Sequence, residues 1–439
     1  MSHSGHDTAP QPPPTGPFAW YHKTPLFARI LVALVIGVIA GEMMGLRAAG
    51  FKPFSSVILR LLSALATPLI FIAVVQALYK ANITGKTGLK LVSLLLMNTV
   101  VAILVGLLVA NVLQPGHHSH VKIETKALTQ KAFDPVEDLL GKIPGSVLKP
   151  LSENDIIAVI MIAVAIGVGL RVLRARATGS LTAPLSIIAG FLDLGFELVM
   201  VVLHWIIALV PFAVFGVVAQ KVGTEGVDAF RPLLWFIVAV LLALGIQACY
   251  YLARIKMSSW VRPGDFLRGA SEALLLAFST ASSAATLPIT YRCMREKIGV
   301  REESASLGVM VGGAFNHDGT ALYEAMAALF ISQLLGRPMD FGHQLVVVFM
   351  SVTASVGAAG IPEAGLVTMM AVFTAVQLPV EYIPMLLVVD WFLDRCRTAI
   401  NVMGDMSVTC ILDGKKRPST LAVVEMEAPA LPAAVAASE

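Results

Sequence analysis

Charged residues are scarce in this sequence, and their scarcity excludes an ordinary soluble protein. Asp, Glu, Lys and Arg make up 14% of the 439 residues, whereas about a quarter of a typical soluble domain is charged. Hydrophobic residues make up 56% of the chain. At this hydrophobicity, the net charge of +3 gives no indication of a nucleic-acid partner. The composition predicts a polytopic membrane protein.

Cysteine is also scarce, which argues against a disulfide framework or a cysteine metal site. The four cysteines are scattered and form no C-x-x-C pair. We expect no cofactor beyond coupling ions. The first residues are rich in proline, and they contain no basic segment followed directly by an apolar run and a cleavage site. We therefore expect no cleaved signal peptide, a disordered tail over 1–24, and a cytoplasmic tail over 413–439.

Long apolar runs are what the sequence has in abundance. A helix needs about 20 apolar residues to cross a bilayer, and several runs approach or exceed this length. They predict spans 1–3 within 25–113 and spans 4–6 within 155–254, separated by an extracytoplasmic loop over 114–154. The runs lie at 25–46, 54–79, 88–113, 155–173, 188–220 and 229–254.

The apolar pattern then changes twice in the same way. Residues 273–290 and 345–376 are apolar at both ends and carry Ser, Gly or Pro in the middle. Each half is long enough for only about half a bilayer, which predicts two re-entrant helical hairpins. A long span with polar residues follows each hairpin. Such a repeat favours a transporter binding site, although two unrelated glycine-rich packing helices remain an alternative. We expect a transport core over 263–333 and 343–412.

Lysine and arginine predict the orientation. With a cytoplasmic N-terminus, the short cytoplasmic connections and the C-terminal side carry most of these residues, as the positive-inside rule requires. The long loop over 114–154 is nearly charge-balanced. We therefore expect both termini in the cytoplasm and a location in the plasma membrane, the inner membrane of a bacterium.

The segment "VVDWFLDRCRTAINVMGD" (388–405) carries unusual polarity for a membrane helix. At 100° per residue, five polar side chains share an arc of about 80°, with Thr398 at its border. Charges at bilayer depth are costly and need partners or a wet cavity. A self-neutralising pair of Asp394 and Arg397 is one interpretation. The excess of carboxylates favours cation binding. The five residues are Asp390, Asp394, Arg397, Asn401 and Asp405.

A second polar segment, "FNHDGTALYE", lies in the preceding span. Asn316 and Asp318 would point in opposite directions on a regular helix, but Gly312, Gly313 and Gly319 flank them. An unwound segment would gather their side chains with free carbonyls, which are the usual membrane ligands of Na⁺. Asp318 and Asp405 are the leading cation carboxylates. The alternative for Asp318 is a cap on a broken helix.

Two further residues are candidate proton sites. Glu324 lies eight residues after Asn316, which places it on a similar face of one continuous helix. A carboxyl group in apolar surroundings binds protons more readily, although a Glu bonded to the backbone is equally consistent. His317 could titrate near neutrality or could be structural.

Four segments together resemble a known family. "STASSAATLPIT", "NHDGTALYE", "ASVGAAGIPEAG" and "DWFLDRCRTAINVMGD" are similar to signature segments of the glutamate transporter family, the dicarboxylate/amino acid:cation symporters. The likeness extends from about residue 25 to residue 412. It implies an all-α polytopic fold with eight transmembrane helices, two re-entrant hairpins and inverted repeats. It also implies a homotrimer in which spans 1, 2, 4 and 5 form a scaffold and the rest moves as an elevator.

The resemblance also assigns roles to individual residues. Arg397 would bind the side-chain carboxylate of the substrate, Asp394 would bind its ammonium group, and Asn401 and Thr398 would bind its backbone end. The hairpin residues Ser283, Ile361 and Gly365 would close the pocket, which Thr320 and Asp390 would also line. One sodium site would use Gly312, Asn316, Asn401 and Asp405, with Asp318 as a further cation ligand. Backbone at Ser355, Val356 and Ala358 would form another. Glu324 matches a proton-carrying Glu.

Two departures from the family pattern concern coupling. His317 replaces a Met that is usual in the family. At a third sodium site beside Asp318, the family offers a Tyr and a Thr or Ser, where this sequence has Leu95, Asn98 and Thr99. The loss of the Tyr and the gain of a His make proton coupling credible.

The sequence therefore predicts a symporter for glutamate or aspartate, not an enzyme, with Na⁺ favoured as the coupling ion. Coupling to protons and transport of C4-dicarboxylates are the main alternatives. An intramembrane aspartyl protease is disfavoured because "NVMGD" lacks the first glycine of a G-x-G-D loop. A passive channel would leave the paired cationic and anionic side chains unexplained.

Overall fold

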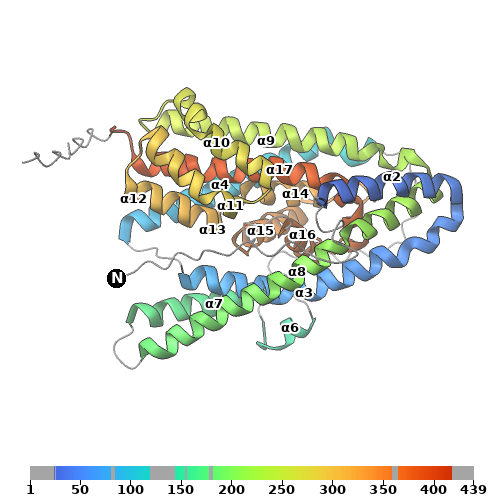
Figure 1. Cartoon of the computed structure of the whole chain (residues 1–439), viewed down its shortest axis with the longest axis horizontal. Helices are drawn as coiled ribbons and strands as arrows, with labels where there is room; N and C mark the ends of the chain where they lie inside the picture. Colours follow the sequence, from blue (N-terminus) through green and yellow to red (C-terminus); the bar gives the residue numbers. More distant parts are fainter. Residues whose placement is uncertain are drawn as a thin grey trace, which may run out of the picture.

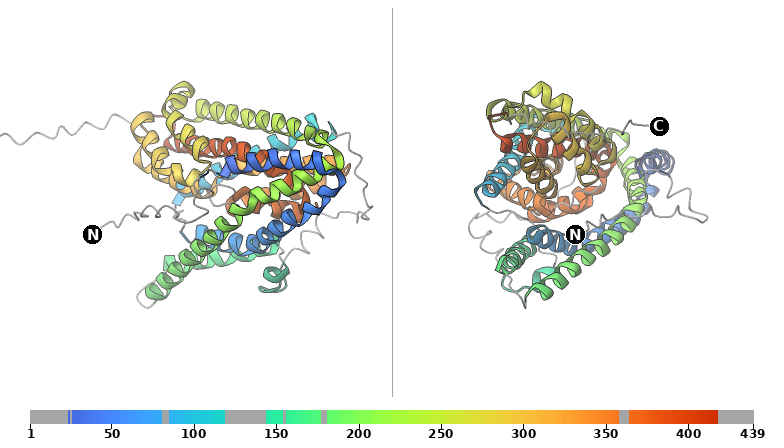
Figure 2. Two further views of the ribbon diagram at one scale, coloured as in Figure 1. Left: turned by 45° about the vertical axis from the view of Figure 1, so that its right-hand side comes forward. Right: turned by 60° about the vertical axis from the view of Figure 1, so that its left-hand side comes forward.

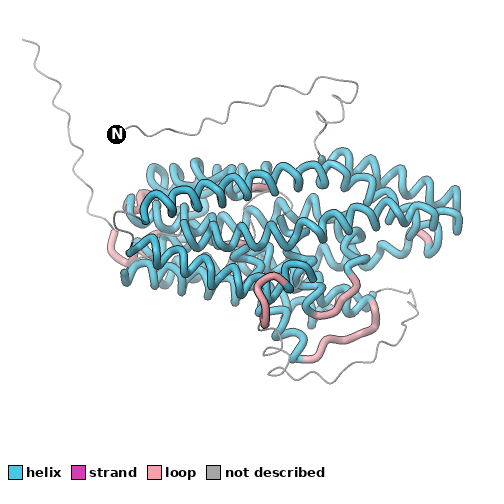
Figure 3. The backbone as a smooth tube through the Cα atoms, turned by 90° about the horizontal axis from the view of Figure 1, so that it is seen from below, coloured by secondary structure: helices cyan, strands magenta, loops and turns pink. Residues whose placement is uncertain are grey.

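The computed structural model describes residue 24 and residues 26–80, 85–118, 144–153, 156–176, 181–357 and 364–417. This part of the chain is almost entirely helical and contains no strand (Figures 1 and 3). The all-α class predicted from the sequence is confirmed. Within the described ranges, five helices are long and apolar enough to cross a membrane. They span Ala28–Ile58, Thr87–His117, Ala158–Arg176, Thr182–Thr224 and Arg231–Ser258.

Four helices form one packed group, which we call the outer group. They are α2 (Leu26–Met44), α3 (Lys52–Lys80), α7 (Ile156–Arg176) and α8 (Thr182–Glu225). The long helix α8 packs along both α2 and α3, while α7 packs along α3 (Figure 2). A short 3₁₀ helix, η1 (Gly45–Phe51), connects α2 to α3.

Two glycines one turn apart explain the tight contact between α2 and α8. A Cβ atom on Gly37 would lie 3.0 Å from the Cβ of Val218, and one on Gly41 would lie 2.7 Å from the Cβ of Val222. Small residues four apart let helix backbones approach closely, and in a membrane such packing replaces the hydrophobic effect as the source of helix association.

The remaining long helices form a second group, which we call the core group. It is built around α14 (Asp318–Leu334), all 17 residues of which are buried. Around α14 pack α4 (Gly85–Leu113) and α17 (Ile383–Asp413), and α9 (Arg231–Ser258) packs on α4 and α17. The outer group meets the core group where α3 contacts α15 and α16 and where α8 contacts α17.

Two helical hairpins complete the core group, as the sequence predicts. The first consists of α10 (Pro263–Thr280) and α11 (Ser283–Arg292). It turns at Ala281, whose φ is 52°, and the hydroxyl of Ser282 then accepts a hydrogen bond from the Ala285 N–H at 3.2 Å. This N-cap begins α11.

The second hairpin consists of α15 (Phe341–Gly357) and α16 (Ala364–Ala375), which pack against each other and on α14. The 12 residues of α16 reach about 18 Å, too short for a bilayer core of about 30 Å. The tip between these helices, including Ala358 and Ile361, lies outside the described residues.

The shorter elements connect these helices. Between the hairpins, α12 (Glu302–Ala305), the π-helical η6 (Ser306–Val311) and α13 (Gly312–Phe315) lead to α14. The others are η2 (Pro115–His118), α6 (Lys149–Glu153), η4 (Val227–Phe230), η5 (Cys293–Ile298) and η7 (Val380–Tyr382).

Apolar side chains remain on the outside of the bundle. Phe191 and Leu194 on α8 are 75% and 70% exposed, and Leu234 on α9 is 65% exposed. Water-facing surfaces rarely carry so many large apolar side chains, so these surfaces fit a hydrocarbon environment. The chain is a membrane protein.

Candidate functional site

The centre of the site is a break between α13 and α14. Asn316 (φ −103°, ψ 94°) and His317 (φ −117°, ψ 52°) leave the helical region. The first N–H groups of a helix lack partners within it, and here α17 supplies one. The side-chain Oδ1 of Asn401 accepts a hydrogen bond from the Gly319 N–H at 2.8 Å. Asn401 therefore fixes the start of α14 against α17.

The polar stripe predicted from the sequence lies on α17, which is continuous from Ile383 to Asp413. All five of its residues are buried within the core group: Asp390, Asp394, Arg397, Asn401 and Asp405. A buried stripe of this kind needs internal partners because the protein interior does not solvate charge.

Arg397 is the most completely buried member, with 0% exposure. Its Nη2 donates a hydrogen bond to Asp394 Oδ1 at 2.8 Å and lies 3.0 Å from Asp390 Oδ1. Its Cζ atom lies 4.0 Å from the centre of the Tyr323 ring. The Nε and Nη1 atoms have no hydrogen-bond partner in the described part of the chain. A planar guanidinium with free N–H groups is suited to a second carboxylate.

The second hairpin approaches this guanidinium closely. A Cβ atom on Gly365, near the start of α16, would lie 3.5 Å from both Nη atoms of Arg397 and 3.4 Å from Thr320 Cγ2. The structure thus brings together Gly365, Thr320 and Arg397. Ser283 is buried at the first position of α11, which packs on α17. The Thr398 hydroxyl donates to the Asp394 carbonyl within α17 at 2.8 Å.

A second group of oxygen atoms lies on the other side of Asn401. The Oδ1 atoms of Asn316 and Asp405 are buried, and neither has a hydrogen-bond partner among the described residues. A Cβ atom on Gly312 would lie only 2.7 Å from Asp405 Oδ1, so glycine is needed for this approach. Unpaired buried oxygens gathered at an unwound helix fit a small hard cation. Two residues of the first predicted sodium site, Asn316 and Asp405, therefore offer oxygens that fit such an ion, while Oδ1 of Asn401 is already bonded to the Gly319 N–H.

The second predicted sodium site has a different arrangement. The carbonyl of Ser355 lies 3.0 Å from the Nδ1 atom of His317, and the Ser355 hydroxyl accepts a hydrogen bond from the His317 N–H at 3.2 Å. The imidazole thus contacts the carbonyl oxygen of Ser355, which we expected to bind a cation. Val356 belongs to the last turn of α15. Ala358 lies beyond the described residues.

Asp318 is held by hydroxyl groups from two other helices. Its Oδ1 accepts a hydrogen bond from Thr99 on α4 at 2.7 Å, and its Oδ2 accepts one from Tyr251 on α9 at 2.5 Å. Next to Thr99, the side chain of Asn98 accepts a hydrogen bond from Arg254. Tyr251 thus gives Asp318 a phenolic hydroxyl from a helix that the sequence did not connect with this carboxylate. Sequence reasoning missed Tyr251 because 67 residues separate it from Asp318.

The prediction that Glu324 shares a helix face with Asn316 is wrong. The helix is broken at Asn316 and His317, so the eight-residue spacing from Asn316 does not define a common face. Glu324 is fully buried on α14, and its Oε1 instead accepts a hydrogen bond from Thr368 of α16. Its Oε2 has no partner among the described residues. The side chain therefore connects α14 to the second hairpin.

Comparison with known proteins agrees with this geometry. Residues 26–415 match the model of the sodium:dicarboxylate symporter family. The chain is 30% identical to an excitatory amino acid transporter of Caenorhabditis elegans, over 88% of this chain and 87% of that protein. It is also 30% identical to C4-dicarboxylate transport protein 1 of Pseudomonas paraeruginosa, over 88% and 87%. Excitatory amino acid transporter 3 of Oryctolagus cuniculus is 30% identical, over 88% and 83%. The chain belongs to the sodium:dicarboxylate symporter family, a family of transporters.

Proposed function

We propose that this protein is a secondary active symporter that imports acidic amino acids, L-glutamate or L-aspartate, across the plasma membrane. The observation that carries this proposal is the environment of Arg397. Its guanidinium is fully buried, is paired with two aspartates, and still has Nε and Nη1 without protein partners. Such a group is costly to bury unless a ligand uses the remaining donors.

The charges around Arg397 match an amino acid that has a second carboxylate. The guanidinium offers paired donors to a carboxylate in a fixed plane. Asp394 and Asp390 lie 2.8 and 3.0 Å from Nη2, so negative charge is available beside the same pocket for an ammonium group. We assign the side-chain carboxylate of the substrate to Arg397 and its ammonium group to Asp394. Thr320, Thr398, Ser283 and Gly365 would complete the enclosure.

Coupling to Na⁺ is supported by the unpaired oxygens of Asn316 and Asp405. They lie at the break between α13 and α14, and Asn401 connects this break to α17. A cation bound there would hold together the two elements that also carry the substrate residues. Proton coupling is the alternative, because His317 occupies the Ser355 carbonyl and Tyr251 is bonded to Asp318.

The division into two helix groups supports an elevator mechanism. The outer group consists of α2, α3, α7 and α8, which correspond to the spans expected to form a trimeric scaffold. The core group carries the described substrate residues, and the proposed cation residues Asn316 and Asp405 lie at the break that leads into its helix α14 and on its helix α17. A core that moved as one body would carry the bound substrate across the membrane without rebuilding the site.

Uptake into proteoliposomes tests this function. Labelled aspartate and glutamate are offered with an inward Na⁺ gradient in one arm and with an inward proton gradient without Na⁺ in the other. We expect accumulation above equilibrium in the Na⁺ arm. Accumulation in the proton arm alone would assign coupling to protons. Accumulation of neither amino acid in either arm would refute the substrate assignment.

Transport of a C4-dicarboxylate is the second candidate. The observation in its favour is that Asp394 is already bonded to Arg397, and relatives named for dicarboxylates are as similar as those named for amino acids. Succinate resembles aspartate without its ammonium group, so measuring the uptake of both compounds distinguishes an amino acid carrier from a dicarboxylate carrier. We expect Asp394→Asn to abolish aspartate uptake. If the wild type takes up no aspartate, and succinate uptake survives Asp394→Asn, the protein is a dicarboxylate carrier.

Arg397→Cys separates a carrier from a passive channel. Without the guanidinium, a carrier loses acidic substrates and could accept neutral ones in their place. The conductance of a pore would change little with the identity of the amino acid. Substrate competition in proteoliposomes that contain the variant measures this difference.

A further inference from the structure

A groove of about 750 Å³ opens between α4 and α9, beside the end of α17. Each of the two helices contributes one stripe of side chains to it. Lys90, Leu94 and Met97 are spaced four and three residues apart on α4, and Tyr250, Arg254 and Met257 have the same spacing on α9. Residues so spaced lie on one helix face, so the groove runs along both helices.

The groove carries positive charge without a lining acid. Three cations line it, Lys90, Arg254 and Lys415, and none of its described lining residues is Asp or Glu. The Lys90 ammonium is 3.4 Å from the carbonyl of Ile411, and no ion-pair partner is recorded for Lys415 within the described ranges.

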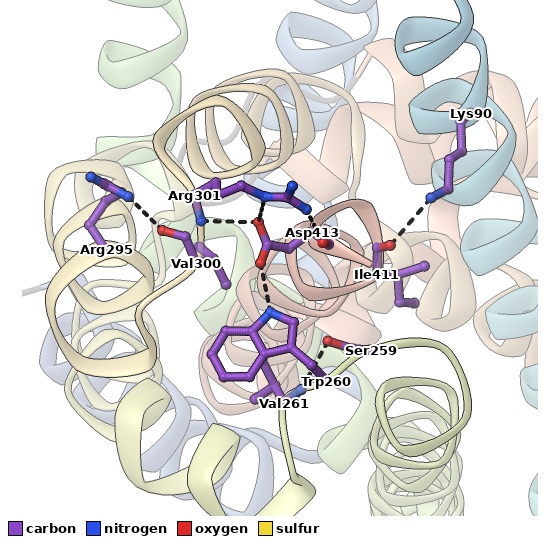
Figure 4. Close-up of polar contacts among 9 residues, drawn as sticks. All are labelled: Lys90, Ser259, Trp260, Val261, Arg295, Val300, Arg301, Ile411 and Asp413. Carbon is purple, nitrogen blue, oxygen red and sulfur yellow. Dashed lines mark hydrogen bonds and ion pairs between the residues drawn. The ribbon is translucent and has the colours of Figure 1, made fainter. Parts of the chain in front are cut away.

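The carboxylate at the end of α17 does not neutralise this groove. Asp413 accepts hydrogen bonds from Trp260 Nε1 at 2.7 Å and from Arg301 Nε at 3.0 Å. Figure 4 shows this cluster on one side of the helix end, with Lys90 on the other side. The positive charge of the groove is therefore available to an anion from outside the chain.

The walls of the groove are apolar; its two methionines face outward, while Leu94 is only 8% exposed. Met97 and Met257 are 44% and 71% exposed on the surface of the bundle. Leu94 and Met97 continue along α4 from Lys90 toward the middle of the helix. An apolar track that begins at a cluster of cations matches a molecule with an anionic head and a hydrocarbon chain. A free inorganic anion would make no use of the methionines.

We propose that this groove binds an anionic phospholipid. The phosphate lies among Lys90, Arg254 and Lys415, and an acyl chain follows Leu94 and Met97. The lysine and arginine distribution places this end of the helices at the cytoplasmic leaflet. Basic pockets between transmembrane helices on that side are suited to anionic headgroups. The proposal does not depend on which substrate the protein carries.

Lipid binding to the purified full chain in detergent tests this proposal, with native mass spectrometry as the readout. The lipids are phosphatidylglycerol and phosphatidylcholine of identical chains. The test variant is K90Q/K415Q. Arg254 is left intact because it also bonds to Asn98, beside the Asp318 cluster. The matched control is R262Q/R268Q, which removes two positive charges from a separate cavity that also contains Trp260.

We expect the wild type and the control to retain phosphatidylglycerol in preference to phosphatidylcholine. The test variant should lose roughly fivefold in affinity for each lysine removed. If the two double variants lose the same affinity for phosphatidylglycerol, the proposal is overturned, because general surface charge would then explain the binding. Equal binding of the two lipids would also overturn it, as would competition by glycerol 3-phosphate at the concentration of the lipid.

A second variant keeps the test valid if K90Q/K415Q does not fold. Met97→Trp retains all three cations and fills the apolar wall of the groove. We expect it to displace phosphatidylglycerol while its melting temperature in detergent stays near that of the wild type. Undiminished phosphatidylglycerol binding by a folded Met97→Trp protein would refute the placement of the acyl chain.

Discussion

Gly404→Ala is the substitution that tests the cation site most directly. Gly404 lies on α17, where it faces the break between α13 and α14. A Cβ atom at this position would lie 2.6 Å from Asn316 Nδ2, 3.0 Å from the Tyr251 hydroxyl and 3.1 Å from Asp318 Oδ2. One methyl group would therefore contact three groups that we place in or beside the cation site.

The size of the effect follows from these distances. The Asn316 amide is about 0.8 Å too close for ordinary van der Waals contact and must move by roughly that amount. Ligand distances at a metal site hold to within about 0.2 Å, so the shift removes Asn316 as a ligand. We expect the apparent affinity for the driving cation to fall at least about tenfold, equivalent to about 1.4 kcal/mol.

Gly245→Ala is the matched control. Gly245 is exposed on α9, and an added Cβ atom there would meet nothing within 4 Å. Replacing glycine by alanine inside a helix normally stabilises it by up to about 1 kcal/mol. The control should therefore have an equal or higher melting temperature than the wild type and should keep its cation dependence.

Uptake in proteoliposomes, measured against the concentration of the driving cation, provides the readout. A Gly404→Ala protein that folds and transports with the apparent cation affinity of Gly245→Ala would refute the proposed role of Asn316 in the cation site. That result would mean that the position of Asn316 does not matter for cation binding. A shift in cation affinity with little change in the maximal rate would support it.

Three further outcomes are expected. Tyr251→Phe removes one hydroxyl from Asp318; an unsatisfied buried acceptor costs about 1–3 kcal/mol, so the melting temperature in detergent should fall, and an unchanged value would mean that another donor replaces it. Glu324→Gln keeps the size of the side chain but cannot release a proton; if Glu324 carries the coupled proton, the pH dependence of uptake should disappear, whereas a retained pH profile would exclude this role. Asp413→Asn removes the charge from a fully buried side chain that accepts hydrogen bonds from Trp260 and Arg301; because hydrogen bonds to charged groups contribute about 1.5–3 kcal/mol, we expect thermal unfolding to show a loss of about that size, and an unchanged stability would contradict this expectation.

The sequence alone determined the features that depend on local patterns. Hydrophobic run length predicted the helices, and the interrupted runs predicted two hairpins. The glycines around Asn316 indicated the broken helix, because glycine tolerates unwinding. The 100° periodicity placed Asp390, Asp394, Arg397 and Asn401 on one face, since this relationship depends only on positions along a single helix.

Only the tertiary structure decided which side chains on different helices contact one another. The bond between Tyr251 and Asp318, the imidazole of His317 at the Ser355 carbonyl, and the contact of Glu324 with Thr368 all join different helices. Helical periodicity fixes which face a side chain occupies, but it does not fix which other helix covers that face. That choice depends on the packing of α4, α9, α15 and α16 around α14 and α17. It decides which oxygens keep a free lone pair for a cation and which are already bonded within the protein.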